Sequence, residues 1–311
     1  MKKFLNYSLI FITLVITFFT SLFFITKKIV IDKTNYKIEK SIDKIIIGHS
    51  HSECAFNDSL VNNCKNISAS ADSYFYSYYK LMTILNNNNN IKTIFVEFSN
   101  NQLTQQSDKW TWDDKYLPFK YQVYGTFINK EGFNFLLNKN PKGLFAGQIK
   151  MLRQNIKIIT TSHYNYLYNR GGYLYLTGNN LKNELENQLK DNSNDKKDSI
   201  ISESNLIYLE KILSFCKEKN IKVYFIRSPM HNKYNGIYNE LILQNICKTR
   251  FRTIEFLDFK DYPLEDSDFS DLEHLNYRGA KKFSIWFNKL LIDSLLEKSN
   301  KQQFINENMI R

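Results

Sequence analysis

The chain has few of the residues that break regular structure or gather around metal ions. Its 311 residues include only 10 glycines and 4 prolines, while Asn, Ile and Lys are abundant, a bias that we attribute to genomic base composition and not to function. The four cysteines form no Cys-x-x-Cys pair, which argues against a zinc site. Oxidation of Cys54 with Cys64 stays open at this level, and buried free thiols are the simpler interpretation.

Arginine-rich motifs are also absent, although basic residues are in excess. The 42 Lys and Arg against 31 Asp and Glu give a formal charge of +11. A nucleic-acid-binding protein usually concentrates its basic residues on one face or in a motif, whereas these are scattered. We therefore expect no nucleic-acid partner, and a surface of this charge favours anionic lipid headgroups or acidic glycans.

Long hydrophobic runs are missing everywhere except near the start. Residues 4–26 carry no charge and would form a helix about 34 Å long, enough to cross a bilayer. The run lacks the small-residue cleavage site of a signal peptide, so residues 1–28 are predicted to be an uncleaved, single-pass membrane anchor. The lysine pairs on both sides determine orientation only weakly, and the short tail favours a domain outside the cytoplasm.

After a polar tether at residues 29–40, short apolar runs alternate with helical patterns. Strands are predicted at 42–47, 91–98, 223–226 and 253–257, and helices at 73–85, 206–216 and from 276 to about 298. This alternation predicts an α/β domain over residues 41–298, with a mainly parallel sheet covered by helices on both faces. Residues 299–311 are predicted to be a polar tail.

An insertion of about residues 102–200 interrupts this pattern, and its first part is rich in aromatic side chains. The rings include Trp110, Trp112, Tyr116, Phe119, Tyr121, Tyr124, Phe127, Phe133 and Phe135. They form either the core of the insertion, which we favour, or a platform that stacks on sugars.

Two short segments carry residues typical of nucleophilic catalysis. Ser50 follows an apolar strand and Gly48, and ligands of open α/β folds bind at the carboxyl edge of the sheet. Asp271 precedes His274 by three residues, a spacing at which the carboxylate can orient the imidazole as a general base. We predict a Ser50–His274–Asp271 triad. The alternative role for Ser50 is to cap the helix that follows.

Four segments in this order make the chain resemble the SGNH (GDSL-type) hydrolases. They are Gly48-His49-Ser50, residues 66–73, residues 95–101 and Asp271-x-x-His274. The chain departs from the family pattern at His49, where the family has Asp, and at Ala71, where it has Gly. The third segment also lacks the family's Gly. The resemblance covers roughly residues 41–101 and 202–298.

The resemblance implies a flavodoxin-like, three-layer α/β fold and catalysis without a cofactor. It also implies an oxyanion hole made by the backbone N–H groups of Ser50 and Ala71 and by the side-chain amide of Asn100 or Asn101. A turn after a strand is the alternative use of these two asparagines.

Three further histidines lie in or after these segments. His49 and His51 flank Ser50, and His231 follows a predicted strand, so all three are candidates for contact with substrate; His231 alternatively closes a turn. A His-x-His pair is also a metal-ligand spacing, but no third ligand is near it in the sequence. We therefore expect no metal.

Taken with the anchor, the resemblance implies a serine esterase or O-acyltransferase. Its expected substrates are acylated, in particular acetylated, glycans outside the cytoplasm or small acyl esters, and its expected partners are proteins of surface-polysaccharide modification. The alternatives are a non-catalytic SGNH-like protein that binds glycan or assembles polysaccharide, and a structural anchor protein.

Overall fold

The computed structural model describes residues 1–165, 171–178, 180–190 and 200–309. They divide into two compact units. We call Met1–Asn35 with Trp112–Tyr166 the helical unit, and Tyr36–Thr111 with Leu167–Arg311 the sheet unit. The expected α/β fold class is confirmed by an all-parallel sheet of five strands.

The sheet has the strand order β2-β1-β3-β4-β5. The strands are β1 (Lys44–Ile47), β2 (Cys64–Asn66), β3 (Thr93–Glu97), β4 (Lys222–Arg227) and β5 (Glu255–Asp258). This is the order of flavodoxin-like folds, in which the chain switches direction across the sheet between β1 and β3. Ligands of such folds bind at that switch point, beyond the carboxyl ends of the two strands.

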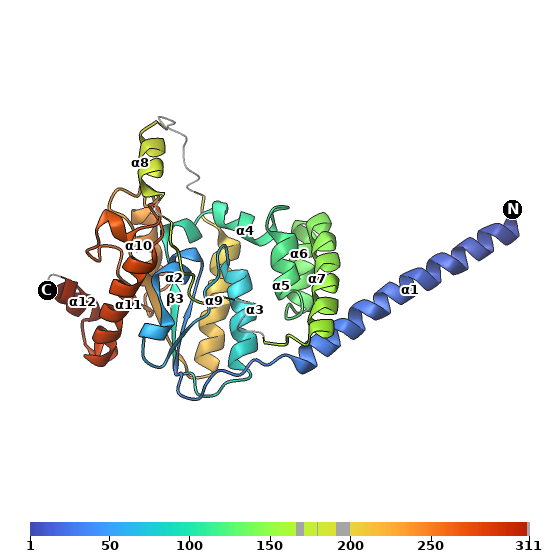
Figure 1. The fold of residues 1–311 in the computed structure, drawn as a ribbon, viewed down its shortest axis with the longest axis horizontal. Helices are drawn as coiled ribbons and strands as arrows, with labels where there is room; N and C mark the ends of the chain where they lie inside the picture. Colours follow the sequence, from blue (N-terminus) through green and yellow to red (C-terminus); the bar gives the residue numbers. More distant parts are fainter. Residues whose placement is uncertain (166–170, 179, 191–199, 310–311) are drawn as a thin grey trace. The chain divides into compact units, whose positions relative to one another are not determined.

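Helices cover both faces of the sheet (Figure 1). One face packs on α11 (Tyr277–Ile292), where Phe283 and Phe287 share a buried cluster with Ile46 of β1 and Phe95 of β3. On the other side lie α3 (Tyr74–Leu85) and α9 (Glu203–Glu218), which pack on each other. The remaining helices of the sheet unit are α2 (Ser50–Ala55), α8 (Leu181–Lys190), α10 (Glu240–Thr249) and α12 (Lys301–Met309), and α4 (Asp108–Trp112) ends at its boundary.

The last two α-helices of the sheet unit are α11 and α12. Asn276 caps α11, because its side chain accepts hydrogen bonds from the N–H groups of Arg278 and Gly279. The helix ends at Ile292, six residues before the predicted end. The predicted polar tail contains α12, whose Ile305 is fully buried in the same hydrophobic cluster as α11.

The helical unit contains α1 (Lys2–Lys33), α5 (Leu117–Tyr124), α6 (Lys130–Lys139) and α7 (Pro141–Thr161). Helix α7 packs on α5, α6 and α1. Tyr121 and Tyr124 are buried, so part of the aromatic insertion is its own core. Helix α1 is long and apolar enough to span a membrane.

The predicted tether is partly ordered. Helix α1 runs through Val30, which is buried, and continues to Lys33. Further along, the N–H of Ile38 donates to Asn88 Oδ1 (2.7 Å), and Asn88 Nδ2 donates to the carbonyl of Tyr36 (2.8 Å). These bonds fix the start of the sheet unit to the loop after α3.

All four cysteines are free thiols. Burial raises the pKa of the Cys54 and Cys64 thiols, so both stay protonated and unreactive at neutral pH.

Candidate active site

The turn from β1 into α2 brings Ser50 to the carboxyl edge of the sheet. A Cβ atom on Gly48 would lie 2.4 Å from Glu97 Cβ and 2.4 Å from Ser52 Oγ, so only glycine allows this close approach to β3. His49 then caps α2, because its Nδ1 accepts from the N–H of His51 (3.4 Å). Ser50 is therefore the first residue of a helix that begins at the switch point between β1 and β3.

Ser50, His274 and Asp271 form one hydrogen-bonded chain. His274 Nε2 lies 2.8 Å from Ser50 Oγ, and His274 Nδ1 lies 2.9 and 3.0 Å from the two carboxylate oxygens of Asp271. Asp271 Oδ1 also accepts the N–H groups of Glu273 (2.9 Å) and His274 (2.8 Å), which holds the loop around the carboxylate. Because Nδ1–H donates to Asp271, Nε2 is left to accept the hydroxyl proton of Ser50.

The electrostatics of this chain favour a basic imidazole. Burial lowers the pKa of His274, but the hydrogen bond and charge of Asp271 outweigh burial and raise the pKa above its ordinary value. Burial opposes ionisation of Asp271 as well, yet its hydrogen bond with His274 brings the pKa of that carboxyl below normal. The His274 and Asp271 side chains each remain 22% exposed, so a substrate can approach them from solvent.

The side-chain amide of Asn100 is hydrogen-bonded within a buried polar network. Its Nδ2 donates to Asn239 Oδ1 (2.9 Å) and to Glu240 Oε2 (3.0 Å), and its Oδ1 accepts from Arg227 (2.9 Å). Arg227 is itself only 1% exposed and pairs with Glu240 and Asp258. Asn100 therefore satisfies a buried arginine and is not placed to bind an oxyanion.

Asn101 instead lies beside His51, whose ring is next to that of His274. Its Nδ2 lies 3.4 Å from His51 Nε2, and its Oδ1 accepts from Ser99 Oγ (2.9 Å). Of the two asparagines that the sequence left open, Asn101 is the one whose amide lies outside the Arg227 network and beside His51.

His49 is linked to Asn101 by hydrogen bonds through Ser99. Its Nδ1 is occupied as an acceptor, so its Nε2–H donates to Ser99 Oγ (2.9 Å), and Ser99 in turn donates to Asn101. His49 is fully buried, and burial lowers its pKa well below the ordinary value, so it is a neutral link in this relay. The fully buried position removes His49 from direct contact with a substrate.

Ala71 has a left-handed backbone conformation, which favours glycine. It is the third residue of a turn closed by Asp72 N–H donating to the carbonyl of Ala69 (3.0 Å), and its φ is +54°. Turns with φ > 0 at this position favour glycine, and a side chain there costs roughly 1–2 kcal/mol. Ala69 N–H donates to the carbonyl of Gly48 (3.1 Å), which holds the turn beside the Ser50 segment.

A second histidine–carboxylate pair lies next to the triad. His51 Nε2 is 3.1 Å from Glu273 Oε2, which also accepts from Tyr234 (2.9 Å), and the rings of His51 and His274 are 5.4 Å apart. His51 is 2% exposed, and burial outweighs Glu273 and lowers its pKa. The neutral ring donates from Nε2 to Glu273, and its Nδ1 has no hydrogen-bond partner among the described residues.

Glu273 and Tyr234 are two residues of the site that the sequence did not predict. Glu273 was visible, since it lies inside the Asp271-x-x-His274 segment and one residue before a histidine. Tyr234 had no such signal.

His231 supports the loop that carries Asp271 and His274. Its Nε2 lies 3.1 Å from Asp266 Oδ1, and its backbone N–H donates to the carbonyl of Leu272 (3.1 Å). The ring also packs edge-on against Phe269. These contacts agree with the turn-closing alternative for His231 better than with contact to substrate.

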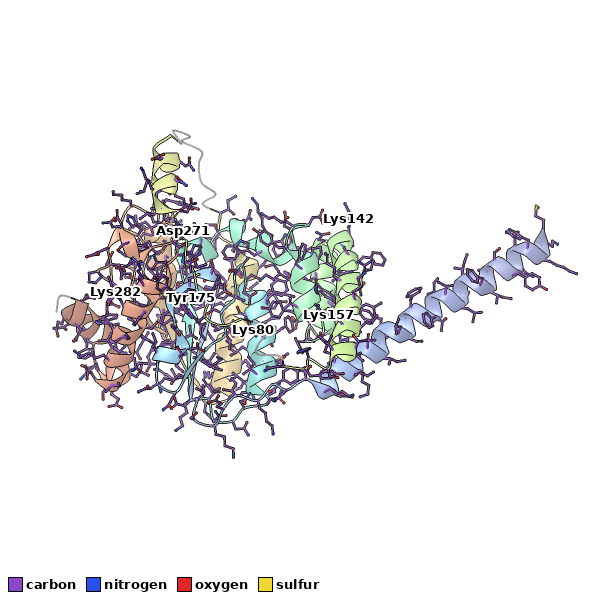
Figure 2. All side chains as sticks on the ribbon, in the orientation of Figure 1. Lys80, Lys142, Lys157, Tyr175, Asp271 and Lys282 are labelled. Atoms are coloured by element: carbon purple, nitrogen blue, oxygen red, sulfur yellow. The ribbon has the colours of Figure 1, made fainter. Side chains whose placement is uncertain are left out.

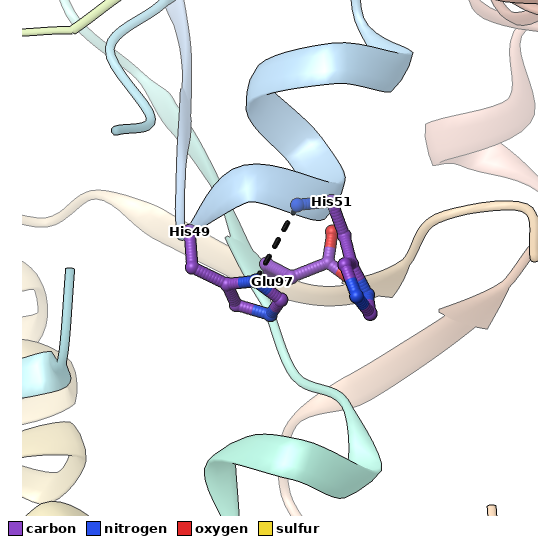
Figure 3. Close-up of side chains that lie close together, drawn as sticks. All are labelled: His49, His51 and Glu97. Atoms are coloured by element: carbon purple, nitrogen blue, oxygen red, sulfur yellow. Dashed lines mark hydrogen bonds between the residues drawn. The ribbon is translucent and has the colours of Figure 1, made fainter. Parts of the chain in front are cut away.

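Figure 3 shows a buried cluster of His49, His51 and Glu97, whose potential ligand atoms all lie within 4.8 Å of one another. The third group was missed because it comes from β3, the strand that pairs with β1. Both oxygens of Glu97 accept from Ser228, from its N–H (3.0 Å) and its Oγ (2.6 Å). Since the Glu97 oxygens and His49 Nε2 are already hydrogen-bonded inside the protein, we assign this cluster no metal.

The cluster also has little negative charge to offer a cation. Burial outweighs the Ser228 hydrogen bonds and raises the pKa of Glu97 to about 7, so a large share of this carboxyl is protonated at neutral pH.

Comparisons with known proteins leave the family open. One family model, which carries no functional description, matches residues 154–296, less than half of the chain. No curated protein matches. Five solved chains match, and one is a "putative platelet activating factor" from Streptococcus pneumonia with 11% identity and a TM-score of 0.39, covering 91% of this chain and 97% of that chain. A likeness this distant supports no conclusion about family or function.

Proposed function

We propose that this chain is a serine-dependent acyl-transfer enzyme of the SGNH type, either an esterase or an O-acyltransferase. The observation that carries the proposal is the continuous chain from Ser50 Oγ through His274 to Asp271, with heavy-atom distances of 2.8 and 2.9 Å. Its position at the switch point of a parallel sheet supports the same conclusion, because ligands of such sheets bind there.

The reaction that fits this geometry has two halves. Ser50 Oγ attacks the carbonyl carbon of an ester while His274 Nε2 takes the hydroxyl proton, and His274 then returns that proton to the leaving alcohol. The acyl group is now bonded to Ser50. In the second half, water or a sugar hydroxyl attacks the acyl carbon, loses its proton to His274, and releases Ser50, which recovers a proton from His274.

Three donors are candidates for the negative oxygen that forms in each half. They are the backbone N–H groups of Ser50 and Ala71 and the side-chain amide of Asn101. Losing one such donor typically costs ~10²–10³ in rate. The His49–Ser99–Asn101 relay gives His49 a positioning role in place of the aspartate of the family pattern.

The location and substrate class belong to the same proposal. Helix α1 supports a single membrane anchor, and the +11 charge suits anionic lipids or acidic glycans. Acylated glycans outside the cytoplasm, with acetyl as the expected acyl group, follow from the resemblance to SGNH proteins. A non-catalytic, glycan-binding role is the alternative if the serine proves unreactive.

An acetyl-transfer assay tests the proposal. Purified full-length protein in detergent is given p-nitrophenyl acetate with and without a neutral or acidic oligosaccharide. We expect p-nitrophenol release that Ser50→Ala abolishes. An esterase should release the acetyl group as acetate, and a transferase should attach it to the sugar. Ser59→Ala, at an exposed serine in the same region, is the matched control and should react like the parent. A folded parent protein that releases no p-nitrophenol under any of these conditions would contradict the proposal.

A further inference from the structure

Helix α7 has two apolar faces, of which one is buried and the other is largely exposed. Leu144, Met151 and Ile158 recur at helical spacing and are buried. A second stripe, rotated around the helix, consists of Phe145, Ile149, Leu152 and Ile156. A helix on the surface of a water-soluble domain normally has polar residues on that face.

Three of the four residues of the second stripe are exposed, Leu152 is half-buried, and the stripe adjoins α1. Phe145 is 64% exposed, Ile149 41% and Ile156 39%. With α1 these residues line a groove of about 680 Å³, whose α1 side includes Phe19, Phe23 and Phe24. The groove lies within the helical unit, where α1 and α7 pack together (Figure 1).

The α1 side of the groove belongs to the hydrophobic span. Phe19, Phe23 and Phe24 lie within residues 4–26, the uncharged part of α1. If α1 crosses the membrane, its last turns lie at the boundary between acyl chains and headgroups, and the stripe on α7 lies beside them. The stripe is thus continuous with a surface that lipid would cover.

The charges on α7 match an anionic lipid surface. The helix contains Lys142, Lys150, Arg153 and Lys157 and no acidic residue. Figure 2 shows Lys142 and Lys157 on this helix, and Arg153 lines the groove. An apolar stripe flanked by Lys and Arg is the pattern of helices that lie in the interface plane of a membrane.

We propose that α7 is an interfacial helix, whose stripe Phe145, Ile149, Leu152 and Ile156 enters the headgroup region of an anionic bilayer beside α1. The basic residues of α7 then face lipid phosphates. This membrane contact goes beyond acyl transfer and does not depend on the reactivity of Ser50. It would hold the helical unit on the bilayer surface in addition to the single span.

The test uses full-length protein reconstituted into phosphatidylcholine vesicles with or without phosphatidylglycerol. In a Cys247→Ser background, an environment-sensitive dye is placed at Ile149→Cys, with Asn134→Cys on the exposed face of α6 as the matched control and Leu14→Cys as a marker of the α1 span. Quenching by lipids that carry a quencher on the acyl chain reports contact with the bilayer, and iodide reports contact with water.

We expect strong lipid quenching at position 14 in both lipids. At position 149 we expect quenching that is several-fold stronger with phosphatidylglycerol, and at position 134 none. Replacing Lys142, Arg153 and Lys157 with Glu should remove the phosphatidylglycerol effect at position 149 while the helix content stays unchanged.

Three results would overturn the proposal. The first is a dye at position 149 that iodide quenches as strongly as the dye at position 134. The second is a dye at 149 shielded from both lipid and iodide, which would mean that another protein or a second copy covers the stripe. The third is the absence of lipid quenching at position 14, because α1 would then not place α7 at a membrane.

Discussion

Two histidine–carboxylate pairs stand side by side next to Ser50, and only one has the properties of a catalytic base. His274 accepts from Ser50, is partly exposed, and has a raised pKa because Asp271 outweighs burial. His51 is 2% exposed, bonds Glu273 instead of the serine, and has a lowered pKa because burial dominates. Both carboxylates come from one loop, so the carboxylate partner does not distinguish the two histidines. What distinguishes them is the exposure of the ring and the group that Nε2 contacts, which is Ser50 for His274 and Glu273 for His51.

The largest expected difference in kcat/KM is between the variants that lack His274 and His51. His274→Ala should lower kcat/KM for p-nitrophenyl acetate by about 10⁴-fold or more, because Ser50 then has no proton acceptor. His51→Ala should lower it by about tenfold at most, through loosened packing against His274 and Asn101. Steady-state kinetics with melting temperatures for both variants measure the contrast. Equal losses would place both rings in the reaction.

Substitution of Asn101 should mainly lower the reaction rate, whereas substitution of Asn100 should mainly lower the free energy of unfolding. Asn101→Ala should lower kcat by ~10²–10³, because it removes the proposed oxyanion donor, and its effect on unfolding should be limited to the lost acceptor for Ser99. Asn100→Ala should instead lower the free energy of unfolding by about 1–3 kcal/mol, because it deprives buried Arg227 of a partner. Chemical unfolding and initial rates on both variants make the comparison, and the reverse assignment would show that Asn100 is the donor.

The pH dependence of kcat/KM should follow His274. Its protonated form cannot accept the Ser50 proton, and its pKa is raised, so kcat/KM should fall as pH drops through a midpoint above 6.5. Asp271→Asn removes the charge that raises this pKa and leaves burial, so the midpoint should move to lower pH. Glu273→Gln is the matched control and should shift it much less. A midpoint that follows Glu273 would assign the base to His51.

The smallest expected effect concerns the turn that carries Ala71. Ala71→Gly should raise the free energy of unfolding by about 0.5–1 kcal/mol, since glycine adopts φ near +54° without strain but loses more chain entropy on folding. The backbone N–H stays in place, so activity should change less than about twofold. Destabilisation by glycine would mean that the turn has another conformation in solution.

Much of the sheet could be predicted from the sequence because its strands are short apolar runs. Ile45, Ile46 and Ile47 mark β1 clearly. Strand β2 was missed because Cys64–Asn66 has three residues, one of them Lys65, and no apolar run. The tail helix α12 was missed because its place depends on Ile305 reaching a distant cluster.

In the candidate site, too, some neighbouring residues could be predicted from the sequence and others could not. Asp271 and His274 could be paired from sequence because three residues in one loop bring them together. Glu97 could not be placed beside His49, because that neighbourhood depends on the register of β1 against β3. Nor could Asn100 be separated from Asn101, since one residue of rotation in a short 3-10 helix decides which amide contacts Arg227 and which contacts His51.

Covalent labelling by a fluorophosphonate probe tests the central claim most directly, because the probe reacts only with a serine that a base activates. Mass spectrometry of the labelled full-length protein should find the adduct on Ser50. The adduct should be lost in His274→Ala and retained in His51→Ala, with circular dichroism unchanged in both. Folded parent protein that stays unlabelled, or an adduct at Ser50 that survives His274→Ala, would contradict the assignment of Ser50 and His274 as nucleophile and base.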